Sequence, residues 1–388
     1  MTAHSPAHHP AGNPARDPAG PVGVGIIGAG NISDQYLTSL TRYPDLHVTV
    51  VGDLDTARAE ARARAYGIRE WGTAADVLAH PDTEIIVNLT VPAVHAEVSS
   101  AILAAGRHVW SEKPLALDRA DARALLDQAA AAGLRVGVAP DTILGPGLQT
   151  ALRAVARGDI GTPLSAQTVM QYAGPDLWHP DPEFLFARGA GPLFDMGPYY
   201  LTALICLFGS VSRVAALGST ARTVRTIRSG QRAGTEFTVA VPTHVSALVQ
   251  FESGGVGQSV FSFDSPLTRT GFVEVTGTEG TLVLPDPNTF AGEVRITRVP
   301  QRGQEAQWET VPPAGAAGAG RGLGVLDMAR AVRSAGPHIA TGELGYHVLD
   351  TLVSIDEAVT SGETVRVAST APAVPLIPED RDPCEATV

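Results

Sequence analysis

The chain has 388 residues, 44% of them apolar, and a formal net charge of −12 at pH 7. This length suits two domains of ordinary size, and the apolar content is sufficient for full-sized hydrophobic cores. The acidic balance excludes a broad basic surface for nucleic acid, and no apolar run reaches the length of a membrane span, so we expect neither kind of partner. Cys206 and Cys384 are far apart in the sequence and indicate neither a disulfide framework nor a zinc cluster, so we expect no metal site and a reducing, cytoplasmic location.

The first third of the chain starts as a low-complexity segment and continues as alternating strands and helices. Residues 1–20 are rich in Pro, Ala, Gly and His and lack the apolar core of a secretory signal, so a disordered tail is predicted there. The strands that we expect next are 22–27, 46–53, 84–89, 107–110 and 134–138. The helices between them are expected at 31–41, 56–66, 93–105 and 118–132. This alternation is typical of a parallel, doubly wound sheet of the α/β class.

Beyond Pro140 the pattern changes to that of an α+β domain, which we place at 141–367. Helices are expected at 147–157 and 192–208, with a strand at 163–172 and an irregular, aromatic-containing stretch at 173–191 between them. Further strands follow at 243–251, 255–263, 271–277 and 280–284. Successive strands joined by glycine turns predict a large, mostly antiparallel open sheet. A Gly/Ala-rich linker at 312–324 precedes two closing helices within 325–361, which are placed to pack back on the first domain, and 368–388 is expected to be a second tail.

A glycine-rich turn links the first expected strand to the first expected helix, in the sequence Gly28-Ala29-Gly30-Asn31-Ile32-Ser33. Gly28 permits a tight turn, Gly30 removes the side chain that would block a pyrophosphate, and the small Ser33 replaces a third glycine. Backbone amides at the helix start, at Asn31 and Ile32, would then meet the phosphates. An ordinary turn without a ligand is the alternative, but the strand before and the helix after it favour dinucleotide binding.

Asp53 ends the second expected strand at the spacing typical of a ribose-binding carboxylate. A carboxylate there accepts hydrogen bonds from the ribose hydroxyls and repels a 2′-phosphate. Leu54 follows it, so no adjacent arginine would hold that phosphate. Residues 21–140 are therefore predicted to form a Rossmann domain that binds NAD in preference to NADP.

Two further segments follow strands of this sheet and would face the same ligand crevice. The first contains Thr90, Pro92 and His95, and the second is Glu112-Lys113-Pro114. We expect Thr90, Pro92, His95, Glu112 and Lys113 to contact the cofactor, although His95 is equally suited to packing or capping. Pro114 restricts Lys113 to an extended backbone, which would direct its ammonium group into the crevice.

Asp195 and Tyr199 lie four residues apart near the start of the helix expected at 192–208, so they share one face of it. A carboxylate and a phenol projected together suit hydroxyl binding and proton transfer. Trp178 and His179, in the irregular stretch just before, would form a wall for a sugar ring, with ordinary packing as the alternative.

These motifs together resemble the glucose–fructose oxidoreductase, inositol dehydrogenase and rhizopine catabolism (Gfo/Idh/MocA) family, over about Val22 to Val367. The resemblance implies a Rossmann domain followed by an α/β domain whose open antiparallel sheet often forms an oligomer interface, so we expect a homodimer or homotetramer through that sheet. It implies that Lys113 is the catalytic lysine and Asp195 a substrate-binding acid. Tyr199 stands where many members have histidine and some sugar oxidoreductases have tyrosine, which argues against a myo-inositol substrate.

We therefore predict an NAD-dependent oxidoreductase that transfers a hydride between nicotinamide and a hydroxyl-bearing carbon of a sugar, sugar derivative or cyclitol. Lys113 would stabilise the developing alkoxide, Tyr199 would exchange the hydroxyl proton, and Asp195 would bind an adjacent hydroxyl; the sequence leaves open which of Lys113 and Tyr199 is the proximate base. The family also includes NAD-dependent glycosidases that oxidise their substrate transiently and a regulator without turnover. A glycosidase and a non-catalytic dinucleotide or sugar sensor are therefore the alternatives.

Overall fold

The computed structural model describes residues 20–300, 303–315 and 318–388, so the predicted N-terminal tail lies almost wholly outside the described residues. The first domain contains a six-stranded parallel sheet in the order β3-β2-β1-β4-β5-β6. Its elements are β1 (Val22–Ile27), α1 (Asn31–Leu40), β2 (Leu46–Gly52), α2 (Thr56–Ala65), β3 (Glu70–Gly72), α3 (Ala74–Ala79), β4 (Ile85–Asn88), α4 (His95–Ala104), β5 (His108–Ser111), α5 (Arg119–Ala132) and β6 (Val136–Val138). The predicted doubly wound sheet is confirmed.

The central position of β1 explains its sequence and places the ligand crevice. All six of its residues, Val-Gly-Val-Gly-Ile-Ile, are buried, as expected for a parallel strand covered on both faces. β1 pairs with β2 on one side and with β4 on the other, so the strand order reverses beside it. In open α/β sheets, ligands bind at the carboxyl ends of the strands at such a reversal.

The second domain is built on a nine-stranded sheet in the order β16-β15-β14-β13-β7-β12-β11-β8-β17. Its strands are β7 (Pro163–Gln171), β8 (Val211–Ser219), β11 (His244–Phe251), β12 (Val256–Ser262), β13 (Arg269–Gly277), β14 (Gly280–Leu284), β15 (Val294–Arg298), β16 (Trp308–Val311) and β17 (Val365–Arg366), with β9 (Val224–Thr226) and β10 (Glu236–Thr238) paired separately. The mostly antiparallel sheet was predicted, and one pair, β7 with β12, is parallel. A parallel pair needs a long crossover, and the chain between β7 and β12 provides one because it contains a long helix.

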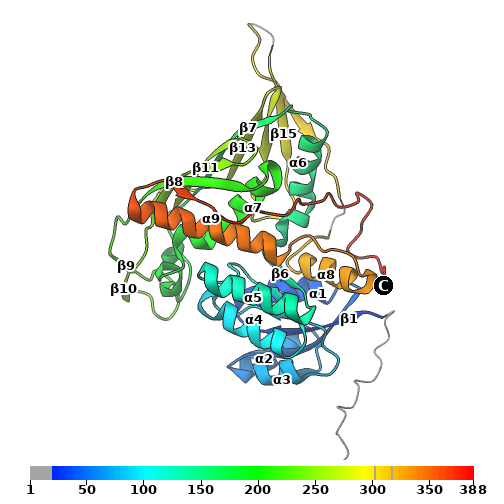
Figure 1. Cartoon of the computed structure of the whole chain (residues 1–388). Helices are drawn as coiled ribbons and strands as arrows, with labels where there is room; N and C mark the ends of the chain where they lie inside the picture. The colour runs from blue at the N-terminus through cyan, green and yellow to red at the C-terminus, as the bar shows by residue number, and fades with distance from the viewer. Residues whose placement is uncertain (1–19, 301–302, 316–317) are drawn as a thin grey trace, which may run out of the picture.

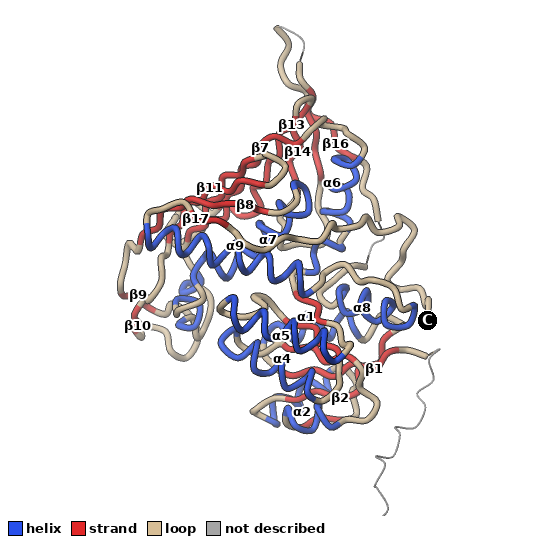
Figure 2. The backbone as a smooth tube through the Cα atoms, in the orientation of Figure 1, coloured by secondary structure: helices blue, strands red, loops and turns tan. Residues whose placement is uncertain are grey.

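Helices cover one face of this sheet and leave the other open. They are α6 (Pro146–Ala156), α7 (Gly191–Phe208) and α9 (Gly342–Ser361), whereas α8 (Leu323–Ser334) lies against the first domain. Figures 1 and 2 show α7 and α9 between the large sheet and the Rossmann domain. Along β11, Val245 and Val249 are buried on the helix side, whereas Leu248 on the other face is 59% exposed. Leu217 of β8 and Val256 of β12 are also exposed.

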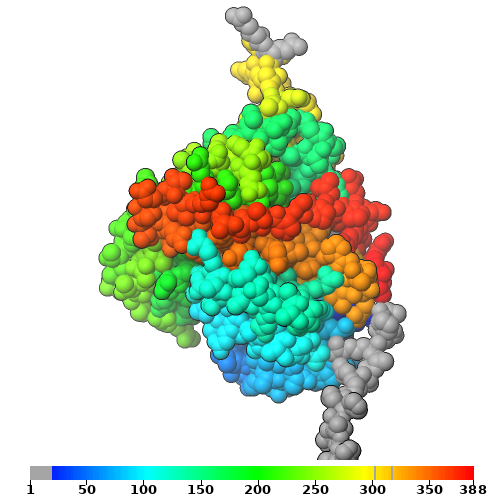
Figure 3. All heavy atoms as spheres, in the orientation of Figure 1, coloured from blue at the N-terminus to red at the C-terminus, as the bar shows by residue number. Residues whose placement is uncertain are grey.

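The end of the chain returns to the first domain. α8 packs against α1 and β6. Residues 368–388 contain neither helix nor strand, and their last amides, of Thr387 and Val388, donate hydrogen bonds to the buried carboxylate of Asp45. Figure 3 shows this C-terminal segment in red along the surface beside α8 in orange. Of the helices in the described ranges, none is both long and apolar enough to cross a membrane.

Candidate active site

A cavity of about 460 Å³ opens where the carboxyl ends of β1, β4 and β5 face the second domain. Most of the predicted site residues line it: Gly30, Asn31, Ile32, Thr90, Pro92, His95, Glu112, Lys113, Trp178, His179, Asp195 and Tyr199. The first eight come from the Rossmann domain and the last four from the second domain, so the structure brings together residues that are far apart in the sequence. Gly28 and Asp53 do not line this cavity. Gly28 belongs to the glycine turn at the edge of the cavity, and Asp53 hydrogen-bonds to that turn.

Two positions of the glycine turn require glycine for different physical reasons. Gly28 has a φ of 108°, and a Cβ atom there would lie 2.7 Å from the carbonyl carbon of Leu89. Gly30 has an extended backbone, and within the described chain a Cβ atom there would meet no atom closer than 4 Å, so a side chain would project into open space at the cavity. No side chain of the described residues caps the start of α1, which leaves its first-turn amides available for an anion.

Asp53 is held beside the glycine turn by two backbone amides. Its carboxylate accepts hydrogen bonds from Ala29 N at 2.7 Å and Asp55 N at 2.9 Å, and its side chain is 12% exposed. Arg58 Nη1 lies 4.0 Å from the same carboxylate and Arg58 Nη2 lies 3.6 Å from that of Asp55. An uncapped helix start, a glycine open to the cavity and a fixed carboxylate together fit a dinucleotide such as NAD.

Lys113 joins the two domains inside the cavity. Its Nζ donates hydrogen bonds to Asp195 Oδ1 at 2.9 Å and to the Asp195 carbonyl oxygen at 2.5 Å. Burial lowers the pKa of Lys113, but the Asp195 carboxylate and the neighbouring Tyr199 and Glu112 outweigh it, so the pKa lies above its ordinary value. Lys113 is therefore an ammonium group at neutral pH. It is also the only lysine in the sequence, a signal that marks it independently of the motif.

Glu112 is anchored by two aromatic residues that no motif in the sequence connects with the site. Tyr36 on α1 donates its hydroxyl hydrogen to Glu112 Oε1 at 2.8 Å, and Trp110 Nε1 donates to the Tyr36 hydroxyl at 3.2 Å. The second carboxylate oxygen accepts from the amide of Lys113. Tyr36 lies on the apolar face of its helix, which in the sequence indicates only a core residue. The network fixes the backbone from which the Lys113 side chain extends.

Tyr199 is a buried phenol between cations. Its ring centroid lies 5.2 Å from Lys113 Nζ and 5.1 Å from Arg321 Cζ, and Arg321 Nη2 lies 3.3 Å from its hydroxyl oxygen. Burial raises the pKa of Tyr199 above its ordinary value, although Lys113 and Arg321 act in the opposite direction. Tyr199 is thus a neutral phenol at neutral pH. Arg321 lies in the segment predicted to be a Gly/Ala-rich linker, so no sequence pattern indicates that it belongs to the site.

His95 connects the two loops that carry the predicted cofactor residues. Its Nδ1 lies 2.7 Å from the Pro114 carbonyl oxygen and its Nε2 lies 3.0 Å from the Thr90 carbonyl oxygen. Burial lowers the pKa of His95, so the neutral ring has one N–H to donate and the shorter contact to Pro114 is the better hydrogen bond. This geometry agrees with the packing alternative, even though His95 also borders the cavity.

Aromatic rings form the outer edge of the cavity. Trp178 is 60% exposed, and its ring contacts that of His179, which in turn contacts Phe184. Phe184, within the irregular stretch predicted at 173–191, also lines the cavity and is exposed. Such rings are available for the apolar face of a substrate.

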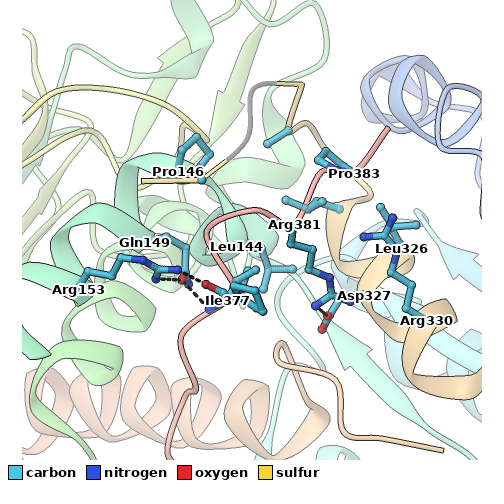
Figure 4. Close-up of a pocket in the computed structure, with 14 residues that line it drawn as sticks. Leu144, Pro146, Gln149, Arg153, Leu326, Asp327, Arg330, Ile377, Arg381 and Pro383 are labelled. Atoms are coloured by element: carbon cyan, nitrogen blue, oxygen red, sulfur yellow. Dashed lines mark hydrogen bonds and ion pairs between the residues drawn. The ribbon is translucent and has the colours of Figure 1, made fainter. Parts of the chain in front are cut away.

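A separate, smaller cavity of about 40 Å³ lies between α6, α8 and the C-terminal segment (Figure 4). Arg153 and Gln149 hydrogen-bond across it to Ile377, and Arg381 pairs with Asp327. The described residues that line it include none of the predicted site residues. In the described part of the chain, no group of three or more His, Cys, Asp or Glu side chains is arranged to hold a metal ion.

Two family models match the chain in succession. Residues 22–139 match the oxidoreductase family with an NAD-binding Rossmann fold, and residues 148–283 match the GFO/IDH/MocA C-terminal domain. Among curated relatives, trans-1,2-dihydrobenzene-1,2-diol dehydrogenase of Bos taurus is 28% identical over 68% of this chain and 74% of its own. 1,5-Anhydro-D-fructose reductase of Ensifer adhaerens is 26% identical over 88% of this chain and 98% of its own.

A solved NAD-binding oxidoreductase from Klebsiella pneumoniae superposes with a TM-score of 0.78 and 25% identity, covering 90% of this chain and 99% of that one. The first match spans the six-stranded sheet, and the second spans the nine-stranded sheet from β7 to β14 without β15, β16 and β17. The chain therefore belongs to the GFO/IDH/MocA oxidoreductase family and carries that family's NAD-binding Rossmann domain at its N-terminal side.

Proposed function

We propose that this protein interconverts a hydroxyl and a carbonyl group on a ring-shaped sugar, sugar derivative or cyclitol, with NAD as the redox partner. The observation that carries this proposal is the meeting of an ammonium, a carboxylate and a phenol, from Lys113, Asp195 and Tyr199, in one cavity beside the glycine turn. These groups supply what the reaction of an alcohol requires: a cation for the developing alkoxide, a proton carrier and a hydroxyl-binding acid.

The residues divide these roles according to their charge states. Bound NAD supplies the hydride acceptor, and its reduced form supplies the hydride donor. Lys113 stays protonated and stabilises negative charge on the substrate oxygen. Tyr199 exchanges the proton with that oxygen: the neutral phenol donates it in the reductive direction, and the phenolate, formed as the pH rises, accepts it in the oxidative direction. Asp195 fixes the Lys113 ammonium group and offers its remaining carboxylate oxygen to a neighbouring substrate hydroxyl.

The substrate class rests on the relatives and on the rim of the cavity. The relatives named above act on a ring-bearing diol and on an anhydro sugar. The exposed rings of Trp178 and Phe184 suit the C–H face of such a ring, while Asp195 and Lys113 suit its hydroxyls.

We further propose that the protein is a cytoplasmic homo-oligomer without a nucleic-acid partner. The open face of the large sheet, with Leu217, Leu248 and Val256 exposed, supports association of two copies through that face. Two unpaired cysteines and a formal net charge of −12 support the location and the absence of a nucleic-acid partner.

The test is an absorbance assay for NADH with a panel of sugars, sugar derivatives and cyclitols, run in both directions with the corresponding ketones. We expect NADH to accumulate in proportion to the alcohol consumed for at least one ring substrate. Cleavage of a glycoside without net NADH would instead establish the glycosidase alternative. Binding of NAD without turnover of any panel member in either direction would overturn the proposal in favour of a sensor.

A further inference from the structure

Tyr199 has a second cationic neighbour that lies outside the motifs of the site. Arg321 belongs to the segment that leads into α8, 122 positions along the chain from Tyr199. Its side chain is only 8% exposed, and Nη2 donates a hydrogen bond of 3.3 Å to the Tyr199 hydroxyl oxygen. Arg321 does not border the cavity, so it reaches the reacting groups only through Tyr199.

The surrounding chain fixes Arg321 in this position. Nη2 also donates to Asn288 Oδ1 at 2.5 Å, and Nη1 lies 3.8 Å from Asp141 Oδ1. Asp141 is fully buried, and its other oxygen accepts hydrogen bonds from the amides of Gly322 and Gly324, on either side of the start of α8. Neither Arg321 Nη1 nor Asp141 Oδ1 has a hydrogen-bond partner among the described residues. The Arg321 guanidinium therefore donates hydrogen bonds to Tyr199 and Asn288 and not to the Asp141 carboxylate.

Several other charged or titratable groups surround Arg321 and Tyr199, and they come from the different elements that pack around these two residues. Those that act on Tyr199 besides Arg321 are Lys113 and Glu112 after β5 and Asp195 on α7. Those that act on Arg321 besides Tyr199 are Asp141, Glu112, Tyr36 on α1 and Asp286 after β14. Lys113 already donates two hydrogen bonds to Asp195, which compensates part of its charge. Arg321 is thus the cation whose hydrogen bond goes to the phenol oxygen itself.

We propose that Arg321 is a positioning residue that stabilises the deprotonated form of Tyr199 and so sets the pH range in which Tyr199 exchanges a proton with the substrate. A hydrogen bond and a nearby positive charge both favour the ionised form of a phenol, whereas burial opposes it. Without Arg321, burial and the carboxylates of Glu112 and Asp195 would be opposed by Lys113 alone. The proposal rests on the proposed role of Tyr199 in proton exchange.

The direct test measures ionisation of Tyr199 without cofactor or substrate. Replacing all tyrosines with a fluorinated tyrosine of lower pKa brings the titration into the stable pH range, and fluorine NMR resolves the individual rings. The resonance missing in Tyr199→Phe identifies the residue. In Arg321→Met we expect the titration midpoint of Tyr199 to move up by about one pH unit or more. An unchanged midpoint would overturn the proposal.

Two further variants separate the charge of Arg321 from its packing. Arg321→Lys keeps a cation near the phenol, so the midpoint should move less than in Arg321→Met. Arg330→Met removes another buried guanidinium from α8, one that pairs with Asp45 instead, and should leave the Tyr199 midpoint in place. An equal shift in Arg330→Met would attribute the effect to general loosening of α8 and would also overturn the proposal.

A kinetic arm distinguishes this proposal from the proposed function. Once a substrate is known, the rising limb of kcat against pH for oxidation should move upward in Arg321→Met by the shift seen in the NMR titration, with KM for the sugar little changed. If no panel substrate turns over, the proposed function fails while the NMR result still decides the role of Arg321. If a substrate turns over but Arg321→Met shifts neither the rising limb of the kcat profile nor the titration midpoint of Tyr199, only the proposed role of Arg321 fails.

Discussion

Lys113 has its side-chain hydrogen bonds with Asp195 of the second domain, so its removal should affect chemistry more than cofactor binding. We expect Lys113→Met to lower kcat by about a hundredfold or more, the usual effect of losing an electrostatic or proton-transfer group. The affinity for NAD, measured by calorimetry, should change far less. Turnover near that of the wild type would refute a catalytic role for the ammonium group.

Tyr199 and Asp195 share one face of α7 but should respond differently to substitution. Tyr199→Phe keeps the buried ring and removes the hydroxyl, so kcat should fall by about a hundredfold with the fold intact. Asp195→Asn removes the charge that raises the pKa of Lys113 and weakens the hold on a substrate hydroxyl, so KM for the sugar should rise more than the Kd for NAD. Parallel kinetics and NAD titrations test both variants. Equal losses of NAD affinity would place these residues in the cofactor pocket instead.

Asp53 should determine the choice between the two nicotinamide cofactors. Its carboxylate is fixed by two amides beside the glycine turn and would meet a 2′-phosphate as a like charge, so the wild type should prefer NAD by at least about tenfold in kcat/KM. Arg58 is close enough to Asp53 to soften this preference. Asp53→Ser should narrow the gap, mainly by lowering KM for NADP. A wild-type enzyme that favours NADP would contradict the placement of Asp53 at the ribose.

At the scale of the element, the strand–turn–helix unit of β1 and α1 offers a matched pair of substitutions. Gly30→Val puts a side chain into open space, so the protein should keep its melting temperature and lose NAD binding, because the side chain occupies the phosphate position. Gly28→Ala should instead destabilise the fold by about 1–3 kcal/mol or more, because the backbone conformation is strained for alanine and the new Cβ meets Leu89. Calorimetric NAD titration and thermal unfolding separate the two effects. Unchanged NAD affinity in Gly30→Val would count against the predicted phosphate site.

The local sequence pattern predicted the long helices and strands and the motif residues. It did not predict features that depend on contacts between residues distant in the chain. The helices α7 and α9 can be recognised from their hydrophobic periodicity, and the glycine turn from its motif, within a short window of sequence. β3 and α3 are too short to give such a signal. Arg321 follows a Gly/Ala-rich run and resembles a solvated linker residue, because its partners Tyr199, Asn288 and Asp141 are distant in the chain. Composition likewise predicts an irregular segment at 368–388 but not the hydrogen bonds that it makes.

At the scale of the whole molecule, we expect the open face of the large sheet to be buried in an interface with a second copy of the chain. Leu248→Glu places a charge among the exposed apolar residues of that face without touching the core, so the mass measured by light scattering should fall to that of a monomer. Ala131→Glu, on an exposed position of α5 in the first domain, serves as the control and should leave the mass unchanged. A wild-type protein that is already a monomer at micromolar concentration would remove this interface from consideration.

The return of the chain to its first domain bears on how the protein is made. Asp45, next to β2, receives hydrogen bonds from Arg330 and from the amide of Thr387, which is 342 residues away. The six-stranded sheet therefore emerges from the ribosome long before the helix and the terminal segment that cover it are synthesised. A nascent Rossmann domain of this protein exposes the surface that α8 later occupies and leaves the Asp45 carboxylate unpaired. The NAD-binding domain is therefore translated before the helix and the segment that complete its surface.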